Sequence, residues 1–135
     1  NNDSSIIFEV NVSLDKLDKL YKLAAYFWHF TGLGIDEEKH PEMVEHLGIT
    51  PLEAMASGCL AFCYSAGGPK ELVTDGKNGF LFTDTDELID KMISVNPNKT
   101  LKEKIIKNGR EFVKENFSYE VFRSKVMELF KVRPK

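Results

Sequence analysis

Two glutamates indicate the chemistry that this chain could perform. Glu45 and Glu53 are eight positions apart, on either side of a small-residue turn at Gly48. Thr50 is a good N-cap and Pro51 suits the first helical position, so we expect a helix to begin here. The free N–H groups at such a helix start favour a bound anion, and the two carboxylates can accept hydrogen bonds from hydroxyl groups. The pattern therefore suits a hydroxyl-rich phosphate ester.

The same residues also allow a purely structural interpretation. The sequence from Thr50 to Glu53 matches a capping box, in which the Glu53 side chain accepts a hydrogen bond from the Thr50 backbone N–H and needs no ligand. Glu45 follows an acidic run over residues 36–42 and could be a solvated loop carboxylate. The local pattern alone leaves both interpretations open.

Three motifs in a fixed order carry a resemblance to a known family. They are an E-x7-E motif from Glu45 to Glu53 followed by Ala-Met-Ala-Ser-Gly58, then Gly67-Gly68-Pro-Lys-Glu71-Leu-Val-Thr-Asp-Gly76, then Asn78-Gly79-Phe80-Leu81. Their order and spacing resemble the C-terminal, donor-binding domain of the retaining GT-B glycosyltransferases, in the family 4 group (glycosyl transferases group 1). The resemblance runs from about Ser13 to the C-terminus and is specific between Glu45 and Phe82.

This resemblance implies an activity and a set of site residues. It implies transfer of a hexose from a nucleoside-diphosphate sugar, such as GDP-mannose or UDP-glucose, to an acceptor hydroxyl with retention of configuration. The matching glutamates in the family make Glu45 the catalytic candidate, facing the transferred sugar, and make Glu53 the acceptor for the ribose hydroxyls. The other donor-binding positions lie where the backbone would approach the phosphates or the sugar: Gly48, Ile49, Thr50, Gly67 and Gly68.

Two alternatives from other functional classes stay open. One is a nucleotide-sugar binding module without activity, and the other is a nucleotide-sugar epimerase or a glycogen-type synthase on the same scaffold. GT-B enzymes generally need no metal and the resemblance implies no cofactor. Cys59 and Cys63 lack a His or Cys partner at metal-ligand spacing, and we expect both to be buried, reduced thiols.

Hydrophobic periodicity predicts strands alternating with helices. We expect strands over residues 6–12, 25–30, 59–64 and 80–82, and helices after a Ser13 cap and over residues 51–57, 69–74, 86–95, 101–115 and 119–132. This alternation implies an α/β fold, a Rossmann-like parallel sheet of about four strands with helices on both faces. Ligands of such sheets bind beyond the carboxyl ends of the strands, where the E-x7-E turn and the glycine pair should lie.

The length of 135 residues suits a single nucleotide-sugar-binding domain over residues 1–135, with C-terminal helices over 101–135. The Arg and Lys that grip the diphosphate in the family do not occur before Ile6. We therefore expect a fragment of a two-domain enzyme, partnered by an N-terminal acceptor domain of the same protein. Trp28 and His29 stand where many relatives have a Pro-Ser pair. His29 could touch the donor, although a structural histidine at a strand end is the commoner case, and we expect Trp28 to pack in the core.

The net charge of −3 combines two opposite halves. Residues 1–90 carry a net charge of −10 and residues 91–135 a net charge of +7. The basic C-terminal third fits the solvated face of helices, and it also allows contact with a membrane surface. We do not expect nucleic-acid binding, because no reading module is recognisable. No apolar run approaches the length of a membrane span, so we expect a cytoplasmic protein, peripheral at the membrane at most.

Overall fold

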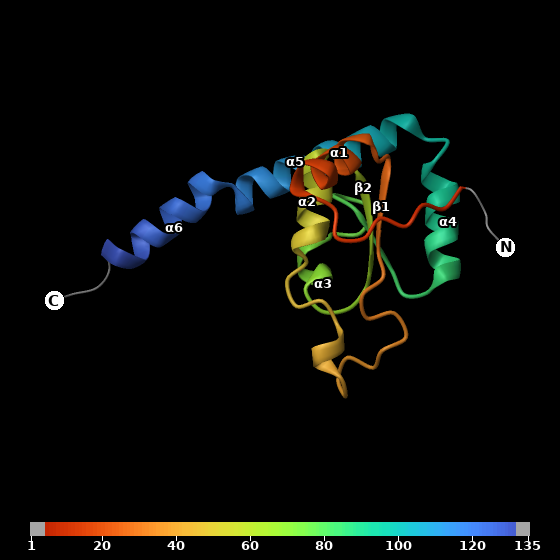
Figure 1. Cartoon of the computed structure of the whole chain (residues 1–135), viewed down its shortest axis with the longest axis horizontal. Helices are drawn as coiled ribbons and strands as arrows, with labels where there is room; N and C mark the ends of the chain where they lie inside the picture. The colour runs from red at the N-terminus through yellow and green to blue at the C-terminus, as the bar shows by residue number, and fades with distance from the viewer. Residues whose placement is uncertain (1–4, 132–135) are drawn as a thin grey trace.

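The computed structural model describes residues 5–131 and shows an α/β fold built on a parallel sheet (Figure 1). Strands β1 (Tyr26–His29), β2 (Leu60–Tyr64) and β3 (Phe80–Phe82) lie in the order β1-β2-β3. Phe27 pairs with Ala61 between the first two strands, and Phe62 pairs with Phe80 between the last two. The predicted parallel sheet is confirmed, with three strands in the described part where about four were expected.

The strand predicted over residues 6–12 does not form, and this prediction was wrong. Ile7 and Phe8 are 77% and 87% exposed, and Asn11 has a φ of +52°, which turns the chain before Ser13. A strand is stable when a neighbouring strand takes its backbone hydrogen bonds and one of its faces is buried. The β-branched composition of this segment is therefore not sufficient, because β1 pairs with β2 and not with it.

The predicted helices are present, with small shifts at their ends. They are α1 (Leu14–Leu23), α2 (Ile49–Ser57), α3 (Pro69–Leu72), α4 (Thr85–Val95), α5 (Lys99–Phe117) and α6 (Tyr119–Lys131). A short 3-10 helix, η1 (Pro41–Met43), also forms and was not predicted. The Ser13 hydroxyl accepts a hydrogen bond from the Lys16 N–H, as predicted for its cap. The Asp84 carboxylate caps α4 in the same way. The predicted end of the last helix, Val132, lies outside the described residues.

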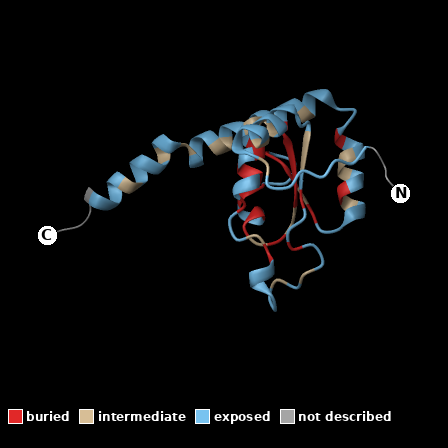
Figure 2. Ribbon diagram, viewed as in Figure 1, coloured by how far each residue is buried: buried red, intermediate tan, exposed pale blue. Residues whose placement is uncertain are grey.

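Helices cover both faces of the sheet because β2 is apolar on both sides. On one face Phe62 stacks on Phe80, with 4.9 Å between the ring centroids, and the cluster extends to Leu88 of α4. On the other face Ala61 and Cys63 pack in a cluster with Met55, Leu52, Leu72 and Val73 of the α2–α3 side. Figure 2 shows this buried layer along the strands. The two-sided burial confirms the expected layered arrangement.

The C-terminal helix extends away from the layered body. In Figure 1, α5 lies against the domain and α6 continues beyond it. Phe122 and Phe130 of α6 are 63% and 69% exposed. Between residues 5 and 131, no helix is both long enough and apolar enough to cross a membrane. Cys59 and Cys63 are buried free thiols, as predicted.

Candidate functional site

The predicted site residues gather beyond the ends of β1 and β2. The connection from β1 to α2 spans residues 30–48 and includes η1, and the connection from β2 to α3 spans residues 65–68. Both leave the sheet at the end where Figure 1 shows η1 and α3. This is the carboxyl edge of the parallel sheet, where ligands of this fold class bind.

Glu45 is held at this edge by three groups of the chain itself. Its Oε1 accepts hydrogen bonds from the N–H groups of Leu47 and Gly48, at 3.2 and 3.1 Å. Its Oε2 lies 3.8 Å from Nε2 of His29. Burial raises the pKa of Glu45, but the two N–H donors and His29 outweigh this effect, so that the pKa is lower than usual. Glu45 is therefore ionised at neutral pH, and 33% of its side chain remains exposed.

The helix after this turn begins earlier than predicted, and the expected Thr50 cap was wrong. Gly48 is the N-cap, with a φ of +91°, and Thr50 lies inside α2. Glycine is favoured at such a φ because it has no Cβ to clash with the backbone. Within residues 5–131, the N–H groups of Ile49 and Thr50 meet no hydrogen-bond acceptor. Two of the three predicted phosphate-binding amides are thus open, whereas the Gly48 N–H already donates to Glu45.

Glu53 faces a different neighbour from Glu45. Its Oε2 accepts a hydrogen bond from the Tyr21 hydroxyl of α1 at 3.3 Å, so the capping box with Thr50 does not form. Burial, and then the charge of Glu53, raise the pKa of Tyr21 to about 12. Both residues line a cavity of about 310 Å³ between α1 and α2, together with Leu14, Leu17, Asp18, Ala56 and Ser57.

Gly67 and Gly68 allow the backbone of residues 45–47 to approach closely, because neither has a Cβ. The Gly68 N–H donates to the Glu45 carbonyl oxygen at 2.7 Å. A Cβ at Gly67 would overlap that same carbonyl, and a Cβ at Gly68 would overlap the carbonyl of His46. The segment that approaches these glycines closely is therefore residues 45–47 of the chain itself, which was not predicted. Approach of a ligand to these glycines stays a prediction.

Several residues of this region were missed or misjudged from the sequence. Tyr21 was not singled out from the sequence, and Glu37 entered only as part of the acidic run over residues 36–42. His29 is buried, as expected for a structural residue, yet its Nδ1 has no hydrogen-bond partner within residues 5–131. The core packing expected for Trp28 was wrong, because its side chain is 50% exposed on the edge strand β1.

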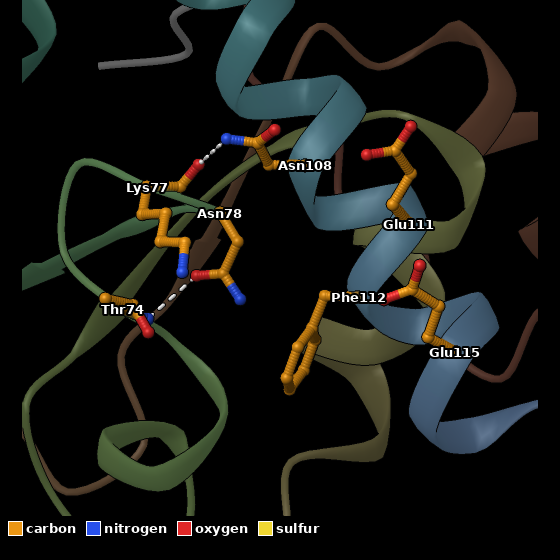
Figure 3. Close-up of a pocket in the computed structure, with 7 residues that line it drawn as sticks. All are labelled: Thr74, Lys77, Asn78, Asn108, Glu111, Phe112 and Glu115. Atoms are coloured by element: carbon orange, nitrogen blue, oxygen red, sulfur yellow. Dashed lines mark hydrogen bonds between the residues drawn. The ribbon is translucent and has the colours of Figure 1, made fainter.

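A second cavity, of about 300 Å³, lies away from these residues (Figure 3). It separates the turn between α3 and β3 from Glu111, Phe112 and Glu115 of α5. The Asn78 side-chain Oδ1 accepts a hydrogen bond from the Thr74 N–H at 2.7 Å, and its side-chain Nδ2 donates to the Leu72 carbonyl oxygen. Asn78 therefore holds the turn in shape, and none of the predicted site residues lines this cavity.

The fold is that of an α/β domain with a Rossmann-like parallel sheet, and comparison identifies its family. The family model described as "Glycosyl transferases group 1" matches residues 2–112. This chain belongs to that family. The C-terminal domain of the glycosyl transferase group 1 family protein LpcC from Francisella tularensis has the same fold, with a TM-score of 0.67 and 23% identity, over 84% of this chain and 53% of that chain.

Other relatives are named for sugar chemistry. The chain is 36% identical over 91 residues to an alpha-1,3/1,6-mannosyltransferase ALG2 of Dictyostelium discoideum, and 30% identical over 100 residues to a sucrose synthase of Denitrovibrio acetiphilus. These matches cover 64% and 68% of this chain but only 21% and 12% of those proteins. A structure of Alr3699/HepE from Anabaena, in complex with UDP and glucose, gives a TM-score of 0.60 at 26% identity, over 66% of this chain and 25% of that chain.

Proposed function

We propose that the protein containing this chain transfers a hexose from a nucleoside-diphosphate sugar to an acceptor hydroxyl with retention of configuration, and that this chain supplies the donor-binding half. One observation carries the proposal: an ionised Glu45 stands directly before a helix whose first N–H groups, on Ile49 and Thr50, are open. The observation supports the proposal because a carboxylate can accept hydrogen bonds from sugar hydroxyls and the neighbouring N–H groups can donate to a phosphate.

Each part of the donor has a counterpart in this arrangement. The open amides of Ile49 and Thr50 bind the diphosphate, and the positive end of α2 favours the negative charge that it gains as the glycosidic bond breaks. Glu45 accepts hydrogen bonds from hydroxyls of the transferred sugar. Glu53 accepts hydrogen bonds from the ribose hydroxyls. Without a donor, the Tyr21 hydroxyl donates to Glu53 instead. Gly67 and Gly68 keep the Glu45 segment close to the sheet edge.

The names of the relatives support the substrate class. Mannosyltransferases and sucrose synthases are among them, and a structural neighbour was solved with UDP and glucose. We therefore propose a nucleotide-sugar donor, with GDP-mannose and UDP-glucose as the first candidates. The acceptor domain is proposed to lie elsewhere in the same protein, since this chain spans at most about a fifth of these curated relatives.

Two experiments test the proposal at different levels. In an NMR titration of this chain with GDP-mannose, UDP-glucose and UDP-N-acetylglucosamine, the amides of Ile49 and Thr50 should shift most, and no response to any donor would contradict the donor site. In the full-length protein, ¹H NMR of the product should show the anomeric configuration of the donor retained. Inverted product would exclude the retaining mechanism while leaving donor binding intact.

A non-catalytic binding module is the alternative, and the same protein distinguishes it. We expect Glu45→Gln in the full-length protein to lower kcat for sugar transfer by about 100-fold or more, the scale seen when an electrostatic contact to the reacting centre is lost. Donor binding should change less, because the open amides of Ile49 and Thr50 remain. Donor binding without any transfer by the unmodified protein would favour the binding module.

A further inference from the structure

The segment that carries Glu45 is a long connection that needs anchors. It spans residues 30–48, and connections longer than about 12–15 residues are uncommon in compact domains unless they are functional. Its regular structure is limited to η1, and much of it is exposed. The position of Glu45 therefore depends on whichever contacts fasten this connection to the sheet edge.

Glu37 makes two such contacts with the start of α3. Its Oε2 accepts a hydrogen bond from the Gly67 N–H at 2.9 Å, and its Oε1 pairs with the Lys70 ammonium of α3. The Lys70 hydrogen bond and then the Gly67 N–H hold the pKa of Glu37 below its usual range. Glu37 thus stays ionised near neutral pH and joins the connection to the start of α3 through two charge-assisted hydrogen bonds.

The second anchor uses the neighbouring glycine. The Gly68 N–H donates to the Glu45 carbonyl oxygen at 2.7 Å, and Gly67 leaves no room for a Cβ against that oxygen. The two ends of the segment from Glu37 to Glu45 therefore attach to neighbouring glycines, Glu37 to Gly67 and Glu45 to Gly68. Loss of the Glu37 contact should therefore change the position of Glu45.

Two other acidic residues of the run, Asp36 and Glu42, make local contacts. Asp36 pairs with Lys39 at 2.6 Å, within the connection itself, and Glu42 lies 3.4 Å from the ring of His40. Glu37 instead reaches across to α3, 33 positions along the chain from its partner Lys70. Glu37 therefore makes a specific long-range contact, which the net charge of the acidic run does not explain.

We propose that Glu37 is a positioning residue for Glu45: through Gly67 and Lys70 it fixes the connection that holds the Glu45 carboxylate beside the open amides of α2. The expected effect of Glu37 on catalysis rests on the proposed function. The contact of Glu37 with Gly67 and Lys70 does not depend on that function. Glu37 acts on the reaction through Glu45 and is not expected to touch the donor.

The test compares neighbouring glutamates in the full-length protein. Glu37→Ala removes both hydrogen bonds, and Glu38→Ala is the matched control on the next, exposed residue. Hydrogen exchange followed by mass spectrometry should show faster exchange in peptides covering residues 45–48 and 67–68 for Glu37→Ala, by about 10-fold or more. Glu38→Ala should exchange as the unmodified protein does.

Activity then separates positioning from general stability. Glu37→Ala should lower kcat by about 10- to 100-fold, the range expected when a reacting group is displaced by about 1 Å. The KM for the donor should change less, and the melting temperature should stay within a few degrees. Lys70→Met should cause part of the same loss in kcat. Lys70→Arg keeps the ion pair and should keep kcat close to that of the unmodified protein.

The outcomes are distinguishable. Unchanged exchange at residues 45–48 in Glu37→Ala would overturn the anchoring role, whatever the activity. Faster exchange with unchanged kcat would overturn the positioning role. A full-length protein that transfers no sugar from any donor tested would instead overturn the proposed function, and the exchange comparison would still decide whether Glu37 anchors the connection.

Discussion

His29 Nε2 lies 3.8 Å from Glu45 Oε2, which brings the last residue of β1 against the first glutamate of the E-x7-E motif. The His29 side chain is 7% exposed, and its Nδ1 meets no partner within residues 5–131. A nitrogen without an acceptor is best left unprotonated, so we assign the ring proton to Nε2, facing Glu45. The neutral ring then supports Glu45 from the sheet side.

This relationship predicts how stability depends on pH. Burial lowers the pKa of His29 below its usual value of 6.5, and the nearby Glu45 opposes this only in part. Because the unfolded chain then binds a proton more readily than the folded chain, stability is lost as the pH falls through about 6.5 toward the lowered pKa. The free energy of unfolding in urea, measured between pH 8 and pH 5, should fall more steeply for the unmodified chain than for His29→Asn. Parallel curves would contradict a buried, neutral His29.

The Tyr21–Glu53 hydrogen bond predicts a shifted tyrosine titration. Burial is the largest cause that raises the pKa of Tyr21 to about 12, and the Glu53 charge adds to it. In Glu53→Gln the pKa should therefore move part of the way back toward 10, because the burial remains. A pH titration by NMR of ¹³C-labelled tyrosine measures this. A Tyr21 pKa that is the same in Glu53→Gln as in the unmodified chain would show that the Glu53 charge does not act on it.

Gly67 and Gly76 offer a matched pair for the close approach at the sheet edge. Both have a positive φ, +53° and +69°, but a Cβ at Gly76 would meet open space, whereas one at Gly67 would overlap the Glu45 carbonyl. Gly76→Ala should cost about 1–2 kcal/mol from backbone strain alone. Gly67→Ala should cost about 3 kcal/mol or more, since the Glu45 segment must also shift. Equal losses in urea unfolding would mean that the segment moves away freely.

The buried thiols predict low reactivity. Burial raises the pKa of Cys63 to about 12 and also raises the pKa of Cys59, so little of the reactive thiolate is present near neutral pH. Iodoacetamide at pH 8 should leave Cys63 unmodified in the folded chain, as read by mass spectrometry. The same reagent in 8 M urea, about the concentration needed to expose the core fully, serves as the control. Rapid modification of folded Cys63 would argue that the sheet opens easily.

Local sequence patterns determined most of the elements of this protein and its family. Helical periodicity and caps such as Ser13 placed the helices to within a few residues, because these signals act over one or two turns of the chain. The apolar run over residues 59–64 predicted a strand, which forms as β2. The order of three short motifs identified the glycosyl transferases group 1 family, which the comparison confirmed.

Only the tertiary structure decided which side chains meet. A β-branched segment over residues 6–12 stayed out of the sheet because no strand pairs with it among the described residues. Glu53 turned to Tyr21 of another helix instead of capping its own, and Glu37 reached Gly67 across 30 positions of the chain. Such contacts depend on how the layers pack and not on neighbouring residues, so no local pattern could select them.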